Sequence, residues 1–376
     1  MRLFQKRAAP PTARPALVRA VGGWIQAGWP ASYDAQLREA FLANPVAQRA
    51  IRLVAEGAAE VPVYAAGEEP GDRRAEALIR QPGLVERVAA QLLLHGNAFV
   101  QFIPDAGGLP AELFALAPDR VTIEQDAQGW PSAYRYRAGE GVTRLAPTDG
   151  AGRPTLVHLR ALNPTDDLLG AGALGAASGA VAVHNAAAAW NKALLDNAAR
   201  PSGALVYEPG EAGATLSPDQ FDRLKREMEQ GFQGANNAGR PMLLEGGLRW
   251  QALSLSPADM DFAELKNGAA RDVALAFGVP PMILGLPGDN TYANYQEANR
   301  ALWRLTVVPL ANRIVRGIAA GLARWWPDLD LRLDLDGLPA LAADRESLWA
   351  QLKGADFLTV AEKREMLGFP PQMQES

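Results

Sequence analysis

The feature that most restricts the fold is an alanine-dominated segment, residues 172–199, with few charged and few bulky side chains. This composition predicts one long helix, because alanine has the highest helix propensity. Small side chains also let two helices approach closely. Two interpretations remain open: an ordinary helix packed inside its own subunit, or a helix packed against copies of itself in a ring. The bulky side chains of the segment are Leu174, Val181, Trp190, Leu194 and Leu195.

A second helix is predicted at residues 257–278, where Gly278 is a typical stop residue. Between the two helices, residues 201–256 predict a small inserted unit. It consists of a strand at 204–207, a helix at 217–232, and strands at 242–244 and 248–253. The helix start is marked by Ser217 as the N-cap, with proline and aspartate directly behind it.

A turn, a loop and a long helix follow the second helix. Gly278-Val279-Pro280-Pro281 predicts an extended turn, because a residue before proline avoids the α region. Residues 285–294 are rich in Gly, Pro, Asp and Asn and predict a long exposed loop. Residues 295–326 repeat apolar positions about every four, which predicts a helix of roughly 45 Å. Pro309 cannot donate to the carbonyl of Leu305, so we expect a kink there.

The rest of the 376-residue chain reads as a mixed α+β module and two terminal helices. Residues 30–170 predict helices at 34–56, divided at Pro45, and at 84–94, and strands at 97–103, 121–125, 134–136 and 156–159. Residues 329–335 alternate leucine with charged residues and predict a strand with one buried side. Terminal helices are predicted at 341–352 and from Thr359, where Glu362 would complete a capping box.

Charge limits the partners of the chain. A formal net charge of -5 and a pI of about 5.5 argue against tight wrapping of nucleic acid. The first twenty residues are the exception, with five basic residues, no acid and several prolines, and we interpret them as a flexible arm. The arm lacks the apolar stretch of a signal peptide, and polar residues interrupt 172–199, so we expect neither secretion nor membrane insertion. The basic residues of the arm are Arg2, Lys6, Arg7, Arg14 and Arg19.

Metal and cofactor sites are not expected. The sequence has no cysteine, and its three histidines, His95, His158 and His184, are scattered. The acidic series at 328–336 is interpreted as a solvated strand face, because a calcium loop would place Arg332 at its first coordinating position.

One motif suggests an enzyme. Gly170, Gly172 and Gly175 fit the G-x-G-x-x-G pattern of a dinucleotide-binding loop. In that fold the first glycine closes a strand directly, whereas here about ten residues separate it from the predicted strand. The phosphate-cradling loop of an ATP motor and the nucleophile elbow of hydrolases are both absent from the sequence. We interpret His95, in an apolar segment, as a structural residue. A nucleotide-cofactor-binding enzyme remains the alternative hypothesis.

Several segments resemble the portal (head-tail connector) proteins of tailed bacteriophages and phage-like gene-transfer particles, over about residues 43–371. They include HGNAFVQFIPDAGGLPAELFALAP from His95, NAARPSGAL from Asn197, and TVAEKREMLGFPP from Thr359. The strongest is DVALAFGVPPMILGLPGDNTYANYQE from Asp272. The resemblance implies an α+β portal fold without enzymatic activity or cofactor.

In that family the chain divides into named parts, which the resemblance places as follows. They are an arm (1–30), a wing (31–170 and 298–340), a stem of two helices (171–200 and 257–285), a small α/β clip (201–256), a tunnel loop (286–297), and a short helical crown (341–376). The long helix with its kink at Pro309 belongs to the wing.

The resemblance also implies function and partners. Twelve subunits would form a ring at one capsid vertex of the virion, assembled in the host bacterial cytoplasm, through which double-stranded DNA is packaged and ejected. The terminase large subunit and the head-tail adaptor would dock on the clip, and the major capsid protein would surround the ring. We expect the tunnel loop to line the bore through Asp289, Asn290, Thr291, Tyr292 and Asn294, unless these residues are an ordinary polar surface loop. The expected docking residues of the clip are Phe221, Lys225, Arg226 and Arg240. A structural adaptor without a channel is a further alternative.

Overall fold

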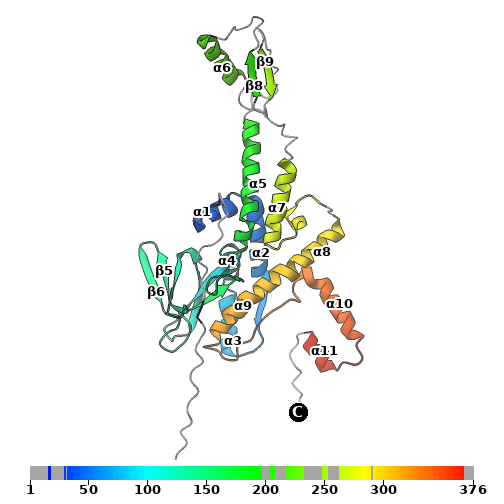
Figure 1. The fold of residues 1–376 in the computed structure, drawn as a ribbon. Coiled ribbons are helices and arrows are strands. Elements are labelled where there is room, and N and C mark those ends of the chain that lie inside the picture. Colours follow the sequence, from blue (N-terminus) through cyan, green and yellow to red (C-terminus); the bar gives the residue numbers. More distant parts are fainter. Residues whose placement is uncertain are drawn as a thin grey trace, which may run out of the picture.

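The computed structural model describes residues 16–17, 29–30, 32–196, 203–207, 217–232, 248–252, 262–288 and 291–367. An α+β body carries two long helices, α5 (Ala173–Asp196) and α7 (Phe262–Ala276), that rise from it side by side (Figure 1). The small unit between these helices lies at their far end. The α+β class predicted from the sequence is therefore confirmed.

The remaining helices belong mainly to the body. They are α1 (Tyr33–Leu37), α2 (Pro45–Glu60), α3 (Pro70–Ile79), α4 (Leu84–Leu94), α6 (Pro218–Phe232), α8 (Tyr292–Leu302), α9 (Val308–Leu322), α10 (Ala342–Lys353) and α11 (Val360–Met366). A π-helical turn, Arg38–Leu42, follows α1, and short 3-10 turns lie at Pro118–Arg120, Pro281–Leu284 and Pro339–Leu341.

In the described residues the strands form four small antiparallel sheets. Their orders are β1-β10, β3-β2-β7, β4-β5-β6 and β8-β9. The strands are β1 (Val63–Ala65), β2 (Asn97–Pro104), β3 (Pro110–Leu116), β4 (Val121–Gln125), β5 (Pro131–Ala138), β6 (Gly141–Leu145), β7 (Leu156–Arg160), β8 (Gly203–Tyr207), β9 (Leu248–Ala252) and β10 (Leu331–Leu333).

Local sequence signals located several boundaries well. Asn44 caps α2 through its side chain and Pro45 opens it, which is the predicted division of the first helix. Thr359 and Glu362 bond reciprocally, with Glu362 N–H donating to Thr359 Oγ1 at 3.2 Å and Thr359 N–H donating to Glu362 Oε2 at 2.8 Å. The capping box is therefore confirmed.

Other predictions were wrong or incomplete. The predicted strand 329–335 is reduced to β10, and Leu335 is 40% exposed. The cause is its partner β1, which has only three residues and follows Pro62, a residue without an N–H to extend the ladder. Four further elements, α3, β1, β3 and β6, were not predicted from the sequence. The strand predicted at 242–244 lies outside the described residues.

The long helix is continuous but irregular. Helices α8 and α9 are joined by a π-helical turn, Trp303–Val307, and together span 31 residues, Tyr292–Leu322. The turn contains Leu305, whose carbonyl cannot accept a hydrogen bond from Pro309, and the helix widens there without breaking. By length and composition alone this helix could cross a membrane. Its apolar face is accounted for by core packing, because Ala311, Ile314, Val315, Ile318 and Leu322 are buried.

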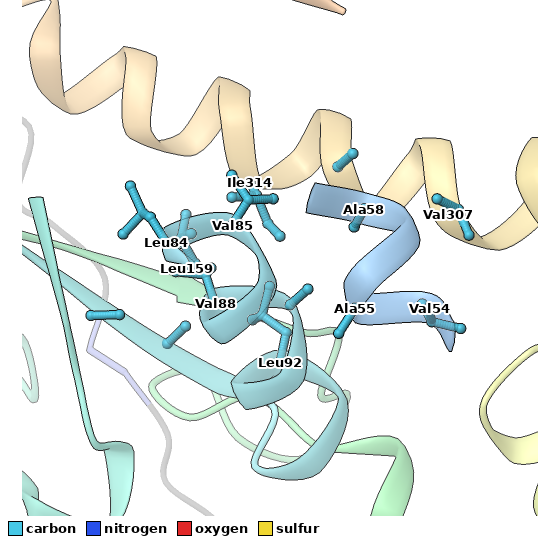
Figure 2. Packing of buried hydrophobic residues seen from close by; sticks show 14 of the residues in the cluster. Val54, Ala55, Ala58, Leu84, Val85, Val88, Leu92, Leu159, Val307 and Ile314 are labelled. Atoms are coloured by element: carbon cyan, nitrogen blue, oxygen red, sulfur yellow. The ribbon is translucent and has the colours of Figure 1, made fainter. Parts of the chain in front are cut away.

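One main core holds the body together. Figure 2 shows α9 lying across α4 and α2, with Ile314 near Val85 and Leu84, and Val307 near Ala58. Most of these side chains are almost completely buried, so apolar burial provides the main stabilisation of this three-helix contact. A second, smaller cluster between β2 and the β4-β5-β6 sheet contains Phe99, Leu116, Tyr134 and Leu156.

The start of α5 is fixed by a close backbone approach. A Cβ atom built on Gly170 would lie 2.1 Å from the carbonyl oxygen of Gly96, and one on Gly172 would lie 2.5 Å from that of Leu94. Asn97 completes the contact: its Oδ1 accepts from Gly170 N–H at 2.8 Å, and its Nδ2 donates to the Gly170 carbonyl at 3.0 Å. These glycines therefore allow two stretches of backbone to pack directly against each other. The preceding strand, β7, ends at Arg160, ten residues before Gly170. This geometry differs from a dinucleotide-binding loop.

The motif glycines provide a matched stability test. We expect Gly170→Ala to destabilise the fold by about 1–3 kcal/mol, because its methyl group would meet rigid backbone. Gly175→Ala should be neutral or stabilising by up to about 1 kcal/mol, because Gly175 lies in α5 with open space around it. Urea unfolding of both variants measures the difference. Equal stability of the two would contradict the packing role.

His158 gives a pH test of the same region. Burial, and then the positive charges of Arg160 and His95, lower the pKa of His158 to about 3. The unfolded chain takes up this proton near pH 6.5, so the free energy of unfolding should fall between pH 6.5 and 3 by roughly 1.4 kcal/mol per pH unit from this group. His158→Gln should flatten the slope measured by urea midpoints at several pH values. An unchanged slope would mean that His158 is protonated in the native state.

Candidate channel segment and assembly surfaces

The predicted tunnel loop is shorter than the sequence indicated. Helix α8 begins at Tyr292, so the second half of 286–297 is helical and not loop. Thr291 is its N-cap, with Oγ1 accepting from Asn294 N–H at 3.2 Å. A Thr N-cap satisfies a free N–H of the first turn, which explains why the helix starts inside the polar segment. Asp289 and Asn290 lie outside the described residues.

The first turns of α8 project from the body. Every residue of 291–297 is exposed, and Tyr292 is 77% exposed. Within this stretch the side chains are polar or aromatic, apart from Ala293, and Gln296 Nε2 donates to the Tyr292 hydroxyl at 2.9 Å. A helix start with this much exposed surface is available to a partner or to a channel.

The base of this segment is firmly held. Gly278 ends α7 with a φ of 67°, and its carbonyl accepts from Thr306 Oγ1 at 2.7 Å. The Arg271 guanidinium donates to the Pro287 carbonyl. A hollow of about 430 Å³ lies here, lined by Arg271, Pro280, Pro281, Met282, Leu286, Pro287, Gly288, Asn294, Glu297 and Ala298. The exposed helix start is thus anchored to α7 at one end and to the π-helical turn at the other.

Helices α5 and α7, the predicted stem, pack along each other but leave apolar surface uncovered. The free face of α5 is an uncharged stripe at helical spacing. Its exposed residues are Gly175, Ala176, Ala182, Val183, Ala186, Ala189, Trp190 and Ala193, and we call them the α5 stripe. Trp190 is 50% exposed, and on α7 Leu275 is 77% exposed. The stripe was not recognised in the sequence, although its small residues already recur every three or four positions.

A buried polar contact fixes the rotation of α5 about its axis. Asn44, 1% exposed, places Nδ2 at 3.2 Å from His184 Nδ1 and donates to Asn185 Oδ1 at 2.9 Å. Asn185 in turn donates to the Glu39 carbonyl at 3.0 Å. Burial, and then the charge of Lys266, lower the pKa of His184, so the ring is held neutral and can accept from Asn44. Because this face is tied to the body, the α5 stripe points away from it.

In the described part of the predicted clip, three of the predicted docking residues are exposed to solvent. Phe221 is 59% exposed, and Lys225 and Arg226 are exposed on the same helix, α6. Ser217 Oγ accepts from Gln220 N–H at 3.3 Å, which confirms the predicted N-cap. Strands β8 and β9 pair in register from Gly203↔Ala252 to Tyr207↔Leu248. Arg240 lies outside the described residues.

His95 and acidic residues of 328–336 make contacts within the fold. His95 stacks edge-on against Tyr33 and lies 3.2 Å from Asn97 Nδ2, which agrees with its interpretation as a structural histidine. Asp330 and Asp336 pair with Arg332 and Arg345. Within the described residues no three His, Asp or Glu side chains are placed to hold a metal.

Comparisons with known proteins identify the family. The family model for phage portal proteins matches residues 45–368. An uncharacterized protein of Rickettsia bellii is 37% identical over 350 residues, covering 88% of each chain. Among solved structures, the chain resembles one described as the neck of an empty gene transfer agent (GTA) particle, which was computed with C6 symmetry. The two chains are 45% identical, with a TM-score of 0.70, and the match covers 91% of this chain and 95% of the other. The neck of a native GTA particle, computed with C12 symmetry, matches with 44% identity and a TM-score of 0.68, covering 92% and 96%.

The family match covers the chain from α2 to α11, including α5, α7 and the small unit between them. The glycine motif that suggested an enzyme lies inside the matched region and has the packing role described above. The chain therefore belongs to the phage portal protein family, a family of structural and non-enzymatic components of phage and gene transfer agent particles.

Proposed function

We propose that twelve copies of this chain form a closed ring at one capsid vertex and that double-stranded DNA passes through its centre during packaging and ejection. The particle necks that resemble this chain were computed with C6 and C12 symmetry, and a ring of twelve is compatible with both. The proposal extends these symmetries to this chain.

The uncovered α5 stripe is the observation that carries the proposal. A single copy leaves Trp190 half exposed and Leu275 largely exposed on neighbouring helices. Apolar surface of this kind is covered in an assembly, and burying these two side chains would contribute about 2–4 kcal/mol to each interface between subunits. The small residues of the stripe allow the close helix approach that such an interface needs.

The start of α8 would line the narrowest part of the bore. Thr291, Tyr292 and Asn294 are exposed on an anchored helix end, and Asp289 and Asn290 directly precede them in the sequence. A bore must let a polyanion slide, so weak contacts with phosphate suit it better than a ring of arginines. The alternative, an ordinary polar surface segment, predicts no effect of added charge.

The remaining parts would serve docking. The clip, with Phe221, Lys225, Arg226 and Arg240, would bind the terminase large subunit during packaging and the head-tail adaptor afterwards. The wing would meet the major capsid protein. The ring would be assembled in the cytoplasm of the host bacterium and retained in the virion.

Assembly can be tested on the stripe. We expect Ala186→Glu to abolish or open the ring, because a carboxylate would be buried between subunits without a partner. Electron microscopy of the purified chain should show annular particles with a central hole, and native mass spectrometry should give their subunit number. Ala77→Glu, an exposed alanine on α3, is the matched control and should leave the rings intact. Intact rings of Ala186→Glu would exclude the stripe from the interface.

The bore assignment predicts a packaging defect. Asp289→Arg combined with Asn290→Arg should lower the DNA content of particles purified from producing cells, because the added guanidinium groups would hold the phosphate backbone. Asp328→Arg with Ala59→Arg makes the same charge change at exposed positions of the body and should leave the DNA content normal. Equal DNA content in both variants would count against the bore assignment.

A further inference from the structure

The β4-β5-β6 sheet has one buried and one solvent-facing side. Tyr134, Tyr136 and Ile123 lie on the inner side and pack on the second core cluster. The outer side carries Arg135 and Arg137 of β5 and Arg144 of β6, all exposed, and Arg120 lies exposed just before β4. This concentration of arginine is unexpected on a chain whose formal net charge is -5.

The arrangement of these arginines is unfavourable for the sheet itself. Arg135 and Arg144 are direct cross-strand partners, and like charges in this position destabilise a sheet. Glu124 offsets part of the repulsion, because its carboxylate oxygens lie 3.2 Å from Arg135 and 2.9 Å from Arg144. Among the described residues, Arg120 and Arg137 have no ion-pair partner. A group of like charges that destabilises the fold is commonly part of a binding site.

The unpaired arginines converge on a hollow. Its volume is about 310 Å³, and its lining consists of Asp119, Arg120, Thr122, Arg135, Arg137 and Val142. Three guanidinium groups, one of which pairs with Glu124, line the hollow together with one hydroxyl and one carboxylate, so the lining carries a net positive charge. Guanidinium groups bind phosphate and carboxylate oxygens through paired N–H donors.

We propose that this outer face of the β4-β5-β6 sheet is a binding surface for the phosphate backbone of DNA, separate from the bore. Arg120, Arg135 and Arg137 bind the phosphates, and Thr122 adds a hydroxyl donor. The surface would bind DNA of any sequence, because the arginines contact phosphates and no described helix or loop on this face is placed to enter a groove of the DNA.

The sequence that precedes the sheet contact of Leu17 favours DNA over an acidic protein segment. Leu17 N–H donates to the carbonyl of Gln128 at 3.0 Å, in the turn between β4 and β5. The stretch of sequence that leads to Leu17 carries four of the five basic residues of the arm and no acid. A run of basic residues in the same chain as a basic patch is typical of proteins that bind nucleic acid without sequence preference.

The test measures binding of a fluorescent duplex of 20 base pairs and mixed sequence to the full-length protein, between 50 and 200 mM NaCl. We expect the triple variant Arg120→Gln, Arg135→Gln and Arg137→Gln to bind at least tenfold more weakly at the lowest salt. The slope of log K against log [salt] should fall in magnitude by up to about 2.7, at about 0.9 for each phosphate that the variant no longer neutralises.

The matched control is Arg38→Gln, Arg52→Gln and Arg80→Gln, which makes the same change in net charge. Each of these arginines is exposed and paired with an acid four residues away, so the change should cost little stability. The control should bind the duplex like the wild type. Equal binding by the two triple variants would overturn the proposal. Displacement of the duplex by poly-L-glutamate as efficiently as by unlabelled DNA would overturn it in favour of an acidic protein partner. Both results are independent of whether the chain forms a ring.

Discussion

The close approach of two stretches of backbone, at Gly96 and at Gly170–Gly172, is the constraint on which the arrangement of this subunit depends. It brings the end of α4 against the start of α5 with no side chain between them, and the amide of Asn97 bonds both backbone groups of Gly170. A helix held this rigidly at its base can project far from the body and keep a defined direction. The contact of Asn44 with His184 and Asn185 adds the second requirement, a fixed rotation of α5. The position of the stripe follows from these two features.

The second stem helix connects assembly to the proposed bore by a short, well-anchored path. Helix α7 is closed by Gly278, the Pro280–Pro281 turn reverses the chain, and α8 starts at Tyr292. From there the same helical run continues through the π-helical turn into the main core, where Ile314 and Ile318 are fully buried. The exposed start of α8 is therefore joined to α7 by a short turn and to the main core by a continuous helical run.

The sequence predicted those features that depend on neighbouring residues, such as helix ends. It did not predict the features that depend on contacts between distant parts of the chain. Caps and breakers, such as Asn44 with Pro45, Gly278, and Thr359 with Glu362, act within a few residues, so they could be predicted. The seven-residue alternation around Leu331 could not give the length of its strand, because the short partner β1 sets it. Thr291 turned part of an expected loop into helix, since a single N-cap outweighed the loop-like composition around it. Glycines 170 and 172 were recognised only as an imperfect nucleotide motif, because their packing partner, Gly96, is about 75 residues away in the chain. The basic sheet face depends on cross-strand register, which the sequence alone did not give.

The radial order of the subunit in its ring is the central claim, and spin-label distances test it directly. The sequence contains no cysteine, so single labels can be placed at Tyr292→Cys, on the exposed start of α8, and at Val142→Cys, on the outer sheet. Figure 1 places these two regions on opposite sides of the body. In a closed ring the distance between neighbouring labels is proportional to their distance from the axis. The account predicts a clearly shorter nearest-neighbour distance for the label at position 292 than for the label at position 142. An equal or longer distance at position 292 would contradict it.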